Sequence, residues 1–323
     1  MKTRQTIPRV SVIIPCYNTA GLVGLCLDSV FAQTYQDFEV VVVNDGSPDT
    51  PELEMALAHY MGRIIYIKQA NKRCAGARNT GIAHARGEFL AFLDSDDTWL
   101  PRHLELQMKQ FEADPLLGLV YANSTLVADG TQSLDFMTKC PSDGPATFET
   151  IAIERCQIPI ATVVARKEAI LKAGGFDENL TRCDDYDMWL RTAFYGAKVG
   201  YIREVTAITA PGARPGSLGQ SNARMIEAYW RILENAHEKL PLTDAQRKLV
   251  RGRADEIHAR YLLEEGKNDL LAGNFPRAQE RIAEANRHFR RAKLSLMLLG
   301  LKFAPNTTSK LFLYWANRQG ALG

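Results

Sequence analysis

Two stretches near the start of the chain decide its fold: VSVIIPCYN, residues 10–18, and VVVNDGSPDT, residues 41–50. Each begins with β-branched residues and ends in turn-forming residues, which is typical of a buried strand followed by a loop. Between them, apolar residues recur close to the helical period, at Leu22, Val23, Cys26, Leu27, Val30 and Phe31. The pattern predicts a strand, a helix and a second strand of an open parallel sheet.

The same alternation continues through the first two thirds of the chain. A helix is predicted over 75–85, followed by a fully apolar strand over 89–93. Shorter apolar runs predict four more strands, at 63–67, 119–121, 160–164 and 199–202. We therefore expect an α/β fold, Rossmann-like, with a mostly parallel central sheet flanked by helices.

Long helical patterns replace this alternation in the last third of the chain. Residues 221–239 and 244–271 predict long helices separated by Pro241, and a Gly-Asn turn then introduces a further helix. The pair resembles half of a tetratricopeptide-like hairpin, but such repeats need about three copies to be stable alone. We expect an α-hairpin packed on the main domain, and divide the chain into a catalytic domain, 8–240, and an α-helical C-terminal region, 241–323.

Composition excludes several classes of protein. The chain has 39 Lys plus Arg against 37 Asp plus Glu, a net charge of +2, so no broad basic surface for nucleic acid is expected. Six scattered cysteines without a CxxC pair suit a reducing cytoplasm rather than a zinc ribbon or a redox dithiol. The N-terminal residues lack the apolar run of a secretory signal, and no segment reaches the roughly 18 apolar residues of a membrane span. We expect a cytoplasmic protein.

An acidic cluster follows the apolar strand over 89–93, and ligands of open parallel sheets bind at the carboxyl ends of strands. It consists of Asp94, Ser95, Asp96 and Asp97. Three carboxylates so close together repel one another unless a cation holds them. Oxygen ligands without a neighbouring His or Cys favour Mg²⁺ or Mn²⁺ over Zn²⁺. The alternative is a cap for a helix predicted over 98–111, although capping needs only one carboxylate.

Phosphate-binding magnesium suggests a nucleotide, yet the chain has neither a P-loop nor a dinucleotide-binding glycine motif. We expect a diphosphate held by metal and side chains. The planar fork of Arg78 suits a nucleobase carbonyl or a phosphate. Asp45, at the end of the second strand, could accept the imide N–H of uracil; Asp45 and Gly46 could equally form an ordinary turn.

A second acidic group lies in TRCDDYDMWLR, residues 181–191. A carboxylate held at a helix start inside a cleft can act as a general base. The alternative is capping of the helix, together with an Asp187 to Arg191 pair along it. The residues alone leave both readings open.

The four motifs, in the order 10–18, 41–50, 75–97 and 174–191, resemble the inverting nucleotide-sugar glycosyltransferases of family 2, whose catalytic domain has the GT-A fold. The resemblance extends from about residue 8 to about residue 220. It implies a nucleotide pocket lined by five residues of the first three motifs, Pro15, Tyr17, Asn18, Asp45 and Arg78.

The resemblance also implies the roles of the acidic residues. The DxD element, which contacts the donor and holds the metal, falls on Asp94, Ser95, Asp96 and Asp97, with Asp96 as the direct ligand. The catalytic base falls on Asp185 and a supporting carboxylate on Asp184, where the family has Glu. Arg214 takes the place of a basic residue that reaches the leaving diphosphate, a place where family members often carry His.

The implied activity is transfer of a sugar, with inversion, from a nucleoside-diphosphate sugar to a hydroxyl of a glycan or a lipid-linked saccharide, in cell-surface polysaccharide synthesis. Asp45 and Arg78 favour a UDP-sugar, and Mn²⁺ or Mg²⁺ is the implied cofactor. The alternative is a catalytically impaired, nucleotide-sugar-binding scaffold that acts through its helical C-terminal region. Only the substituted Asp184 and the neighbouring Cys183 favour that alternative.

The C-terminal residues 293–303 and 311–315 are apolar with basic neighbours. This composition is compatible with peripheral attachment at the inner face of a membrane. It is equally compatible with packing on the catalytic domain or self-association with a second copy of the chain. We expect packing, since large exposed apolar surfaces are uncommon on a soluble monomer.

Overall fold

The structure is a computed structural model that describes residues 7–128, 132–139, 142, 144–209 and 222–318. The chain divides into two compact units, residues 1–218 and 219–323. The sequence placed this division at 240. Helix α9 (Asn222–Lys239) packs against the helix that follows it and lies within the second unit.

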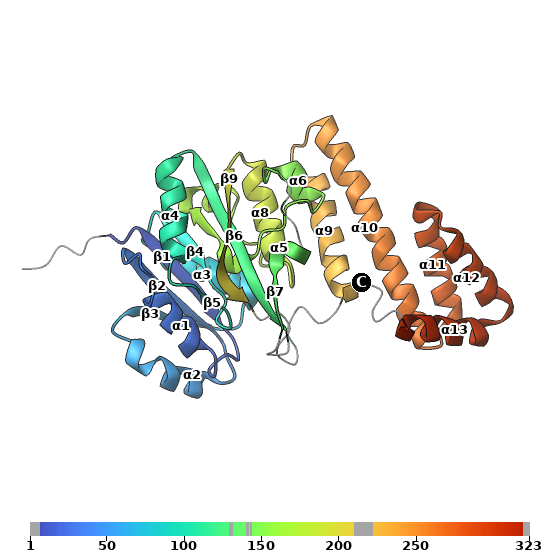
Figure 1. The fold of residues 1–323 in the computed structure, drawn as a ribbon, viewed down its shortest axis with the longest axis horizontal. Helices are drawn as coiled ribbons and strands as arrows, with labels where there is room; N and C mark the ends of the chain where they lie inside the picture. Colours follow the sequence, from blue (N-terminus) through green and yellow to red (C-terminus); the bar gives the residue numbers. More distant parts are fainter. Residues whose placement is uncertain (1–6, 129–131, 140–141, 143, 210–221, 319–323) are drawn as a thin grey trace, which may run out of the picture. The chain divides into compact units, whose positions relative to one another are not determined.

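The first unit is built on one sheet (Figure 1), in the order β3-β2-β1-β4-β8-β6-β9-β5, with β7 paired to β6. Its strands in the described part of the chain are β1 (Val10–Cys16), β2 (Phe38–Asp45), β3 (Ile64–Gln69), β4 (Phe89–Phe92), β5 (Thr98–Trp99), β6 (Leu117–Ala128), β7 (Gln132–Asp135), β8 (Val164–Arg166) and β9 (Lys198–Thr209).

Helices connect these strands and cover the sheet. They are α1 (Val23–Phe31), α2 (Thr50–Leu57), α3 (Arg73–His84), α4 (His103–Ala113), α5 (Phe136–Lys139), α6 (Phe148–Ala152), α7 (Lys167–Lys172) and α8 (Asp184–Phe194), with short 3₁₀ turns η1 (Ala58–Tyr60) and η2 (Ile160–Thr162). The α/β fold class predicted from the sequence is confirmed.

The predicted parallel sheet occupies the N-terminal half of the first unit. β1 pairs in parallel with β2 and with β4, and β2 pairs in parallel with β3. Every residue of β1 is buried, which explains why its sequence is mostly apolar, because a strand covered on both faces needs no polar alternation; the one polar side chain, Ser11, donates to Glu39 Oε1 at 2.7 Å. The other half is mixed, since β8 runs antiparallel to both β4 and β6.

Two predicted elements differ in the structure. The strand expected at 160–164 begins only at Val164, because Thr162 donates from both its backbone N and its hydroxyl to Pro159 O, at 3.0 and 2.8 Å, and closes the turn η2. The helix expected over 98–111 begins only at His103, because Thr98 and Trp99 pair with β9 instead.

The second unit contains α9, α10 (Asp244–Leu271), α11 (Phe275–Phe289), α12 (Ala292–Phe303) and α13 (Pro305–Arg318), coloured yellow to red in Figure 1. Helix α10 has the predicted bounds and starts with a capping box, in which Thr243 and Gln246 satisfy each other's backbone N–H groups. Gly266 lets α10 approach α11, since a Cβ there would lie 2.7 Å from Ile282 Cγ1. In the described residues, no helix combines the length and apolarity needed to cross a membrane.

Candidate functional site

The candidate site lies where β2, β1 and β4 end side by side. These strands are neighbours in the parallel part of the sheet, so the loops that follow them emerge at one edge. Hydrogen bonds join the loops to one another: Asn18 N donates to Ser47 Oγ at 2.6 Å, and Ser95 Oγ donates to Thr19 Oγ1 at 2.9 Å. The first, second and third motifs therefore form one polar surface.

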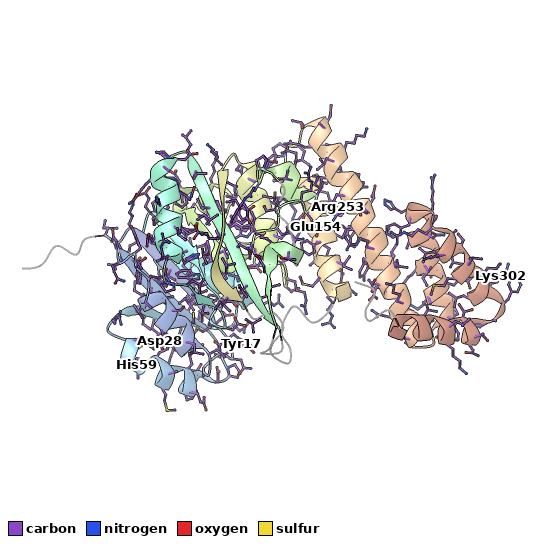
Figure 2. All side chains as sticks on the ribbon, in the orientation of Figure 1. Tyr17, Asp28, His59, Glu154, Arg253 and Lys302 are labelled. Carbon is purple, nitrogen blue, oxygen red and sulfur yellow. The ribbon has the colours of Figure 1, made fainter. Side chains whose placement is uncertain are left out.

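The loop after β1 supplies residues predicted for the nucleotide pocket. Pro15 is buried within β1, whereas Tyr17 is 52% exposed in the loop that follows (Figure 2). Asn18 has a left-handed backbone, with φ of 54°, and its backbone N bonds the loop after β2. The backbone of Ala20 adds a second link, because its N–H donates to Asp49 Oδ2 at 2.8 Å.

Asp45 ends β2 and is buried. Its Oδ1 accepts hydrogen bonds from Gln69 Nε2 at 2.7 Å and from the backbone N of Lys72 at 2.8 Å, so it holds the loop after β3 against the end of β2. Gly46 forms the tight turn that the sequence suggested: its φ is +63°, and a Cβ there would lie 2.7 Å from Asn71 N. The contact of Asp45 with a nucleobase stays a prediction.

The acidic element Asp94–Asp97 forms the loop between β4 and β5. The backbone N of Asp97 donates to Asp94 O at 3.0 Å, which closes a turn. Asp94 and Asp96 are half-buried, whereas Ser95 and Asp97 are buried. The helix-cap alternative is wrong for these residues, because α4 starts at His103 and has no side-chain cap.

Arg78 joins this element to the second acidic group. Its side chain comes from α3 and is only 4% exposed, and it donates from Nη2 to Asp94 Oδ1 at 2.7 Å and from Nη1 to Asp184 Oδ2 at 2.6 Å. Burial alone would lower the pKa of Arg78, but the two carboxylates raise it well above its usual value, so it stays charged. We call this three-residue unit the Arg78 bridge.

The Arg78 bridge gives Arg78 a different set of partners from the one predicted. The sequence suggested a direct contact of its guanidinium with a nucleobase or a phosphate. Both terminal nitrogens donate to carboxylates in the structure, one in each acidic group. Contact with a nucleotide stays a prediction, whereas the link between the two acidic groups is a feature that sequence reasoning missed.

The second acidic group opens helix α8. Cys183 precedes the helix with a left-handed backbone, φ 55°, and offers no side-chain cap. Asp187 pairs with Arg191, as the alternative reading proposed, with Arg191 Nε 2.9 Å from Asp187 Oδ2. Asp184 belongs to the Arg78 bridge instead, so helix capping does not account for this group.

Asp185 lies between these two residues and accepts a hydrogen bond from the backbone N of Tyr186 at 2.9 Å. Burial and the negative charge of Asp184 raise the pKa of Asp185 to about 6, against the opposing pull of Arg78. A carboxylate with such a pKa is ionised at neutral pH and basic enough to accept a proton, which suits a general base.

The acidic element offers carboxylate oxygens, the ligands that a divalent metal such as Mg²⁺ prefers. In the described part of the chain, no three or more His, Cys, Asp or Glu side chains are arranged to hold a metal ion. Mg²⁺ often takes only one or two protein carboxylates and completes its coordination with substrate phosphates and water. The half-buried carboxylates of Asp94 and Asp96 therefore fit an ion that a bound diphosphate would also coordinate.

Sequence reasoning missed some parts of the site and named one that cannot be placed. Thr19, Ser47 and Asp49 link the loops, and their positions beside the first two motifs were the available signal. The Arg78–Asp184 contact joins residues distant along the chain and left no such signal. Arg214 lies outside the described residues.

Comparisons with known proteins agree with this geometry. Residues 11–153 match the family model described as glycosyl transferase family 2. The chain is 34% identical over 194 residues to an uncharacterized glycosyltransferase of Rickettsia typhi, a match over 59% of this chain and 60% of that protein. It is 29% identical over 232 residues to the amylovoran biosynthesis glycosyltransferase AmsB of Erwinia amylovora, covering 68% of this chain and 75% of AmsB.

Solved structures share the fold. TarS 1–349 of S. aureus, in complex with UDP-GlcNAc, superposes with a TM-score of 0.62 at 17% identity, covering 97% of this chain and 92% of that one. The mannosyltransferase PcManGT from Pyrobaculum calidifontis, in complex with GDP-Man and Mn²⁺, has a TM-score of 0.62 at 22% identity, covering 96% and 85%. These likenesses confirm the GT-A fold class.

Proposed function

We propose that the chain, whose residues 11–153 match the family model described as glycosyl transferase family 2, is an inverting glycosyltransferase. It moves a sugar from a nucleoside-diphosphate sugar to a hydroxyl of a glycan or a lipid-linked saccharide. The observation that carries the proposal is the Arg78 bridge, because it connects the acidic element suited to the donor's diphosphate with the acidic group that contains the candidate base.

Asp185 is the base in this proposal. It accepts the proton of the acceptor hydroxyl while that oxygen bonds to the anomeric carbon, and the bond from the anomeric carbon to the diphosphate oxygen breaks on the opposite face. The raised pKa of Asp185, about 6, supports this role, since a base should be ionised at the working pH and still hold a proton well.

Asp94 and Asp96 would hold the divalent cation, Mn²⁺ or Mg²⁺, with Ser95 and Asp97 shaping the loop that presents them. When bound, such an ion neutralises the negative charge that grows on the departing diphosphate. Arg78 keeps the carboxylate of Asp94 oriented, and Arg214 is the proposed basic partner of the diphosphate.

The donor pocket consists of the loops after β1 and β2. We assign the nucleobase to the surface formed by Pro15, Tyr17, Asn18 and Asp45, and uracil to that base, since a buried carboxylate suits an imide N–H. The complex of TarS with UDP-GlcNAc supports a UDP-sugar as the donor. The complex of PcManGT with GDP-Man supports the main alternative, a GDP-sugar.

The proposed acceptor and pathway rest on what the relatives of this chain are named for. AmsB is named for amylovoran biosynthesis, which supports an acceptor that is a growing polysaccharide or its lipid-linked precursor. Against the scaffold alternative stands the fixed position of Asp184, the substituted residue that favoured it, since Arg78 Nη1 lies 2.6 Å from Asp184 Oδ2.

The test combines binding with turnover. Thermal unfolding is followed with UDP-GlcNAc, GDP-Man and other nucleotide sugars, with Mn²⁺ or with EDTA, because a ligand that binds the native state raises the melting temperature. We expect a UDP-sugar to stabilise the protein in the presence of Mn²⁺ and to be hydrolysed slowly. Stabilisation without any hydrolysis or transfer would favour the scaffold, and no stabilisation by any nucleotide sugar would reject the proposal.

A further inference from the structure

Helix α12 is apolar on two opposite faces, and only one of them is covered. Four residues of one face pack around the small core that Leu270, Ala278 and Ile282 form in the second unit: Leu294, Met297, Leu298 and Leu301. This face is thus covered by the neighbouring helices of the same unit, whereas the sequence analysis expected packing on the catalytic domain or on a second copy. The other face carries three large apolar side chains that remain exposed, Leu296 at 68%, Leu299 at 57% and Phe303 at 74%.

Exposed basic residues lie on both sides of these apolar residues. At about 100° per residue, Leu296, Leu299 and Phe303 share one narrow stripe of the helix. The same geometry places Lys293 along one edge of the stripe and Lys302 along the other, and both lysines are exposed. Lys302 is labelled in Figure 2. We call these five residues the α12 surface.

The charge of the whole C-terminal segment has one sign. Residues 285–323 contain seven Lys and Arg and no Asp or Glu, although the complete chain has a net charge of only +2. The exposed apolar side chains of α12 are thus surrounded in sequence by positive charges without acidic neighbours to neutralise them. A partner that covers this surface must accept apolar side chains and supply negative charge.

We propose that the α12 surface docks the protein on an anionic lipid membrane. An interfacial helix buries an apolar face among the acyl chains while flanking Lys residues meet the headgroups, and negatively charged lipids attract such a helix. Lys side chains at the edges of the stripe have the length to reach the headgroup level while the leucines and the phenylalanine insert.

Charge favours the membrane over a second copy of the chain. In a two-fold symmetric dimer the same patch meets itself, so Lys293 and Lys302 would face the same lysines of the partner. Like charges oppose that contact, and no acidic residue within 285–323 is available to offset them. An anionic bilayer offers the opposite charge over the entire surface.

The test is flotation of the full-length protein with phosphatidylcholine vesicles, either pure or containing about 30% phosphatidylglycerol. We expect flotation only with the anionic vesicles, and weaker flotation as salt is raised. The variant Leu296→Ser/Leu299→Ser/Phe303→Ser should lose at least about tenfold in partitioning, and Lys293→Gln/Lys302→Gln should lose less.

Leu116→Ser is the matched control, because Leu116 is also highly exposed, at 78%, but lies in the first unit. It should float like the wild type. Circular dichroism and gel filtration check that each variant is folded and report its oligomeric state. If the triple variant unfolds, the lysine variant, which leaves the buried core under α12 unchanged, decides.

Three results would overturn the proposal. One is a wild-type protein that does not float with anionic vesicles. Another is flotation that folded α12 variants retain in full. The third is a wild-type dimer that the triple variant converts to a monomer while vesicle binding is unchanged. The donor-binding test uses no lipid and the flotation test uses no nucleotide sugar. A failure of one experiment therefore rejects only the proposal that it tests.

Discussion

The two units of this chain use positive charge in opposite ways. In the first unit, Arg78 is buried and both of its terminal nitrogens are occupied by carboxylates. In the last helices of the second unit, lysines lie exposed beside apolar side chains in a segment without acidic residues. A buried charge must be paired within the fold, whereas an exposed charge can be kept for a partner. The comparison contrasts the interior of the proposed reaction site with the proposed docking surface.

Removing the Arg78 guanidinium should have the largest effect. Arg78→Leu leaves Asp94 and Asp184 close together and uncompensated, so we expect the free energy of unfolding to fall by about 3–5 kcal/mol in urea titrations. Arg78→Lys should lose less stability but still impair the site, because one ammonium group cannot reproduce a fork that reaches two carboxylates.

A double variant tests whether the loss comes from the carboxylates. Combined with Arg78→Leu, Asp184→Asn should be less destabilising than the sum of the two single changes, because the amide needs no counter-charge. Simple additivity would show that Arg78 stabilises the unit by packing rather than by pairing with Asp184.

The next largest effect is expected at the base. Asp185→Asn should lower turnover by at least about a hundredfold, while the thermal shift produced by the donor stays close to that of wild type. Asp177→Asn is the control, since Asp177 Oδ1 accepts hydrogen bonds from the backbone N and the Nδ2 of Asn179 and an amide oxygen can replace it. Near-wild-type turnover of Asp185→Asn would remove Asp185 from the mechanism.

The pH dependence should be more moderate. Because the pKa of Asp185 is raised to about 6, the base is active above that pH and becomes protonated below it. Turnover should be half-maximal near pH 6 and fall about tenfold for each further unit of acidification. A pH–rate profile checks this. An acidic limb near the ordinary Asp value of about 4 would mean that neither burial nor Asp184 acts on the base as described.

The smallest effect concerns packing in the second unit. Gly266→Ala should destabilise the protein by about 1 kcal/mol, because its Cβ would meet Ile282. Gly252→Ala, in the same helix but with nothing within 4 Å, should be neutral or slightly stabilising. Thermal unfolding of both variants gives the comparison, and equal melting temperatures would contradict close α10–α11 contact at Gly266.

Elements with strong local signals were predictable. β1 and β2 are buried runs of β-branched residues, and α10 is bounded by the cap at Thr243 and the left-handed Gly273. β5, with two residues, and β8, with three, were missed or misplaced because their neighbours in the sheet define them. The loops of the site could be predicted because ligands of parallel sheets bind at the carboxyl ends of strands, and polar residues that follow an apolar strand can be recognised in the sequence.

The ion pairs of Arg78 could not be predicted from the sequence around each residue. Nothing in the sequence around Arg78 indicates that its guanidinium faces Asp184, because that contact depends on how α3 and α8 approach in space. The same holds for α12: its sequence is apolar on two opposite faces, and only the packing around Leu301 shows which face is left exposed.

The Arg78 bridge has a consequence for anyone who would redesign this protein. Asp94 shares its counter-charge with Asp184, the immediate neighbour of Asp185, so the three positions are coupled through one guanidinium. If Asp94 is a metal ligand and Asp185 the base, as proposed, replacing Asp94 would also alter proton abstraction, and a working substitute would need compensating changes at Arg78 or Asp184. Related chains that differ at one of these positions should therefore tend to differ at the others.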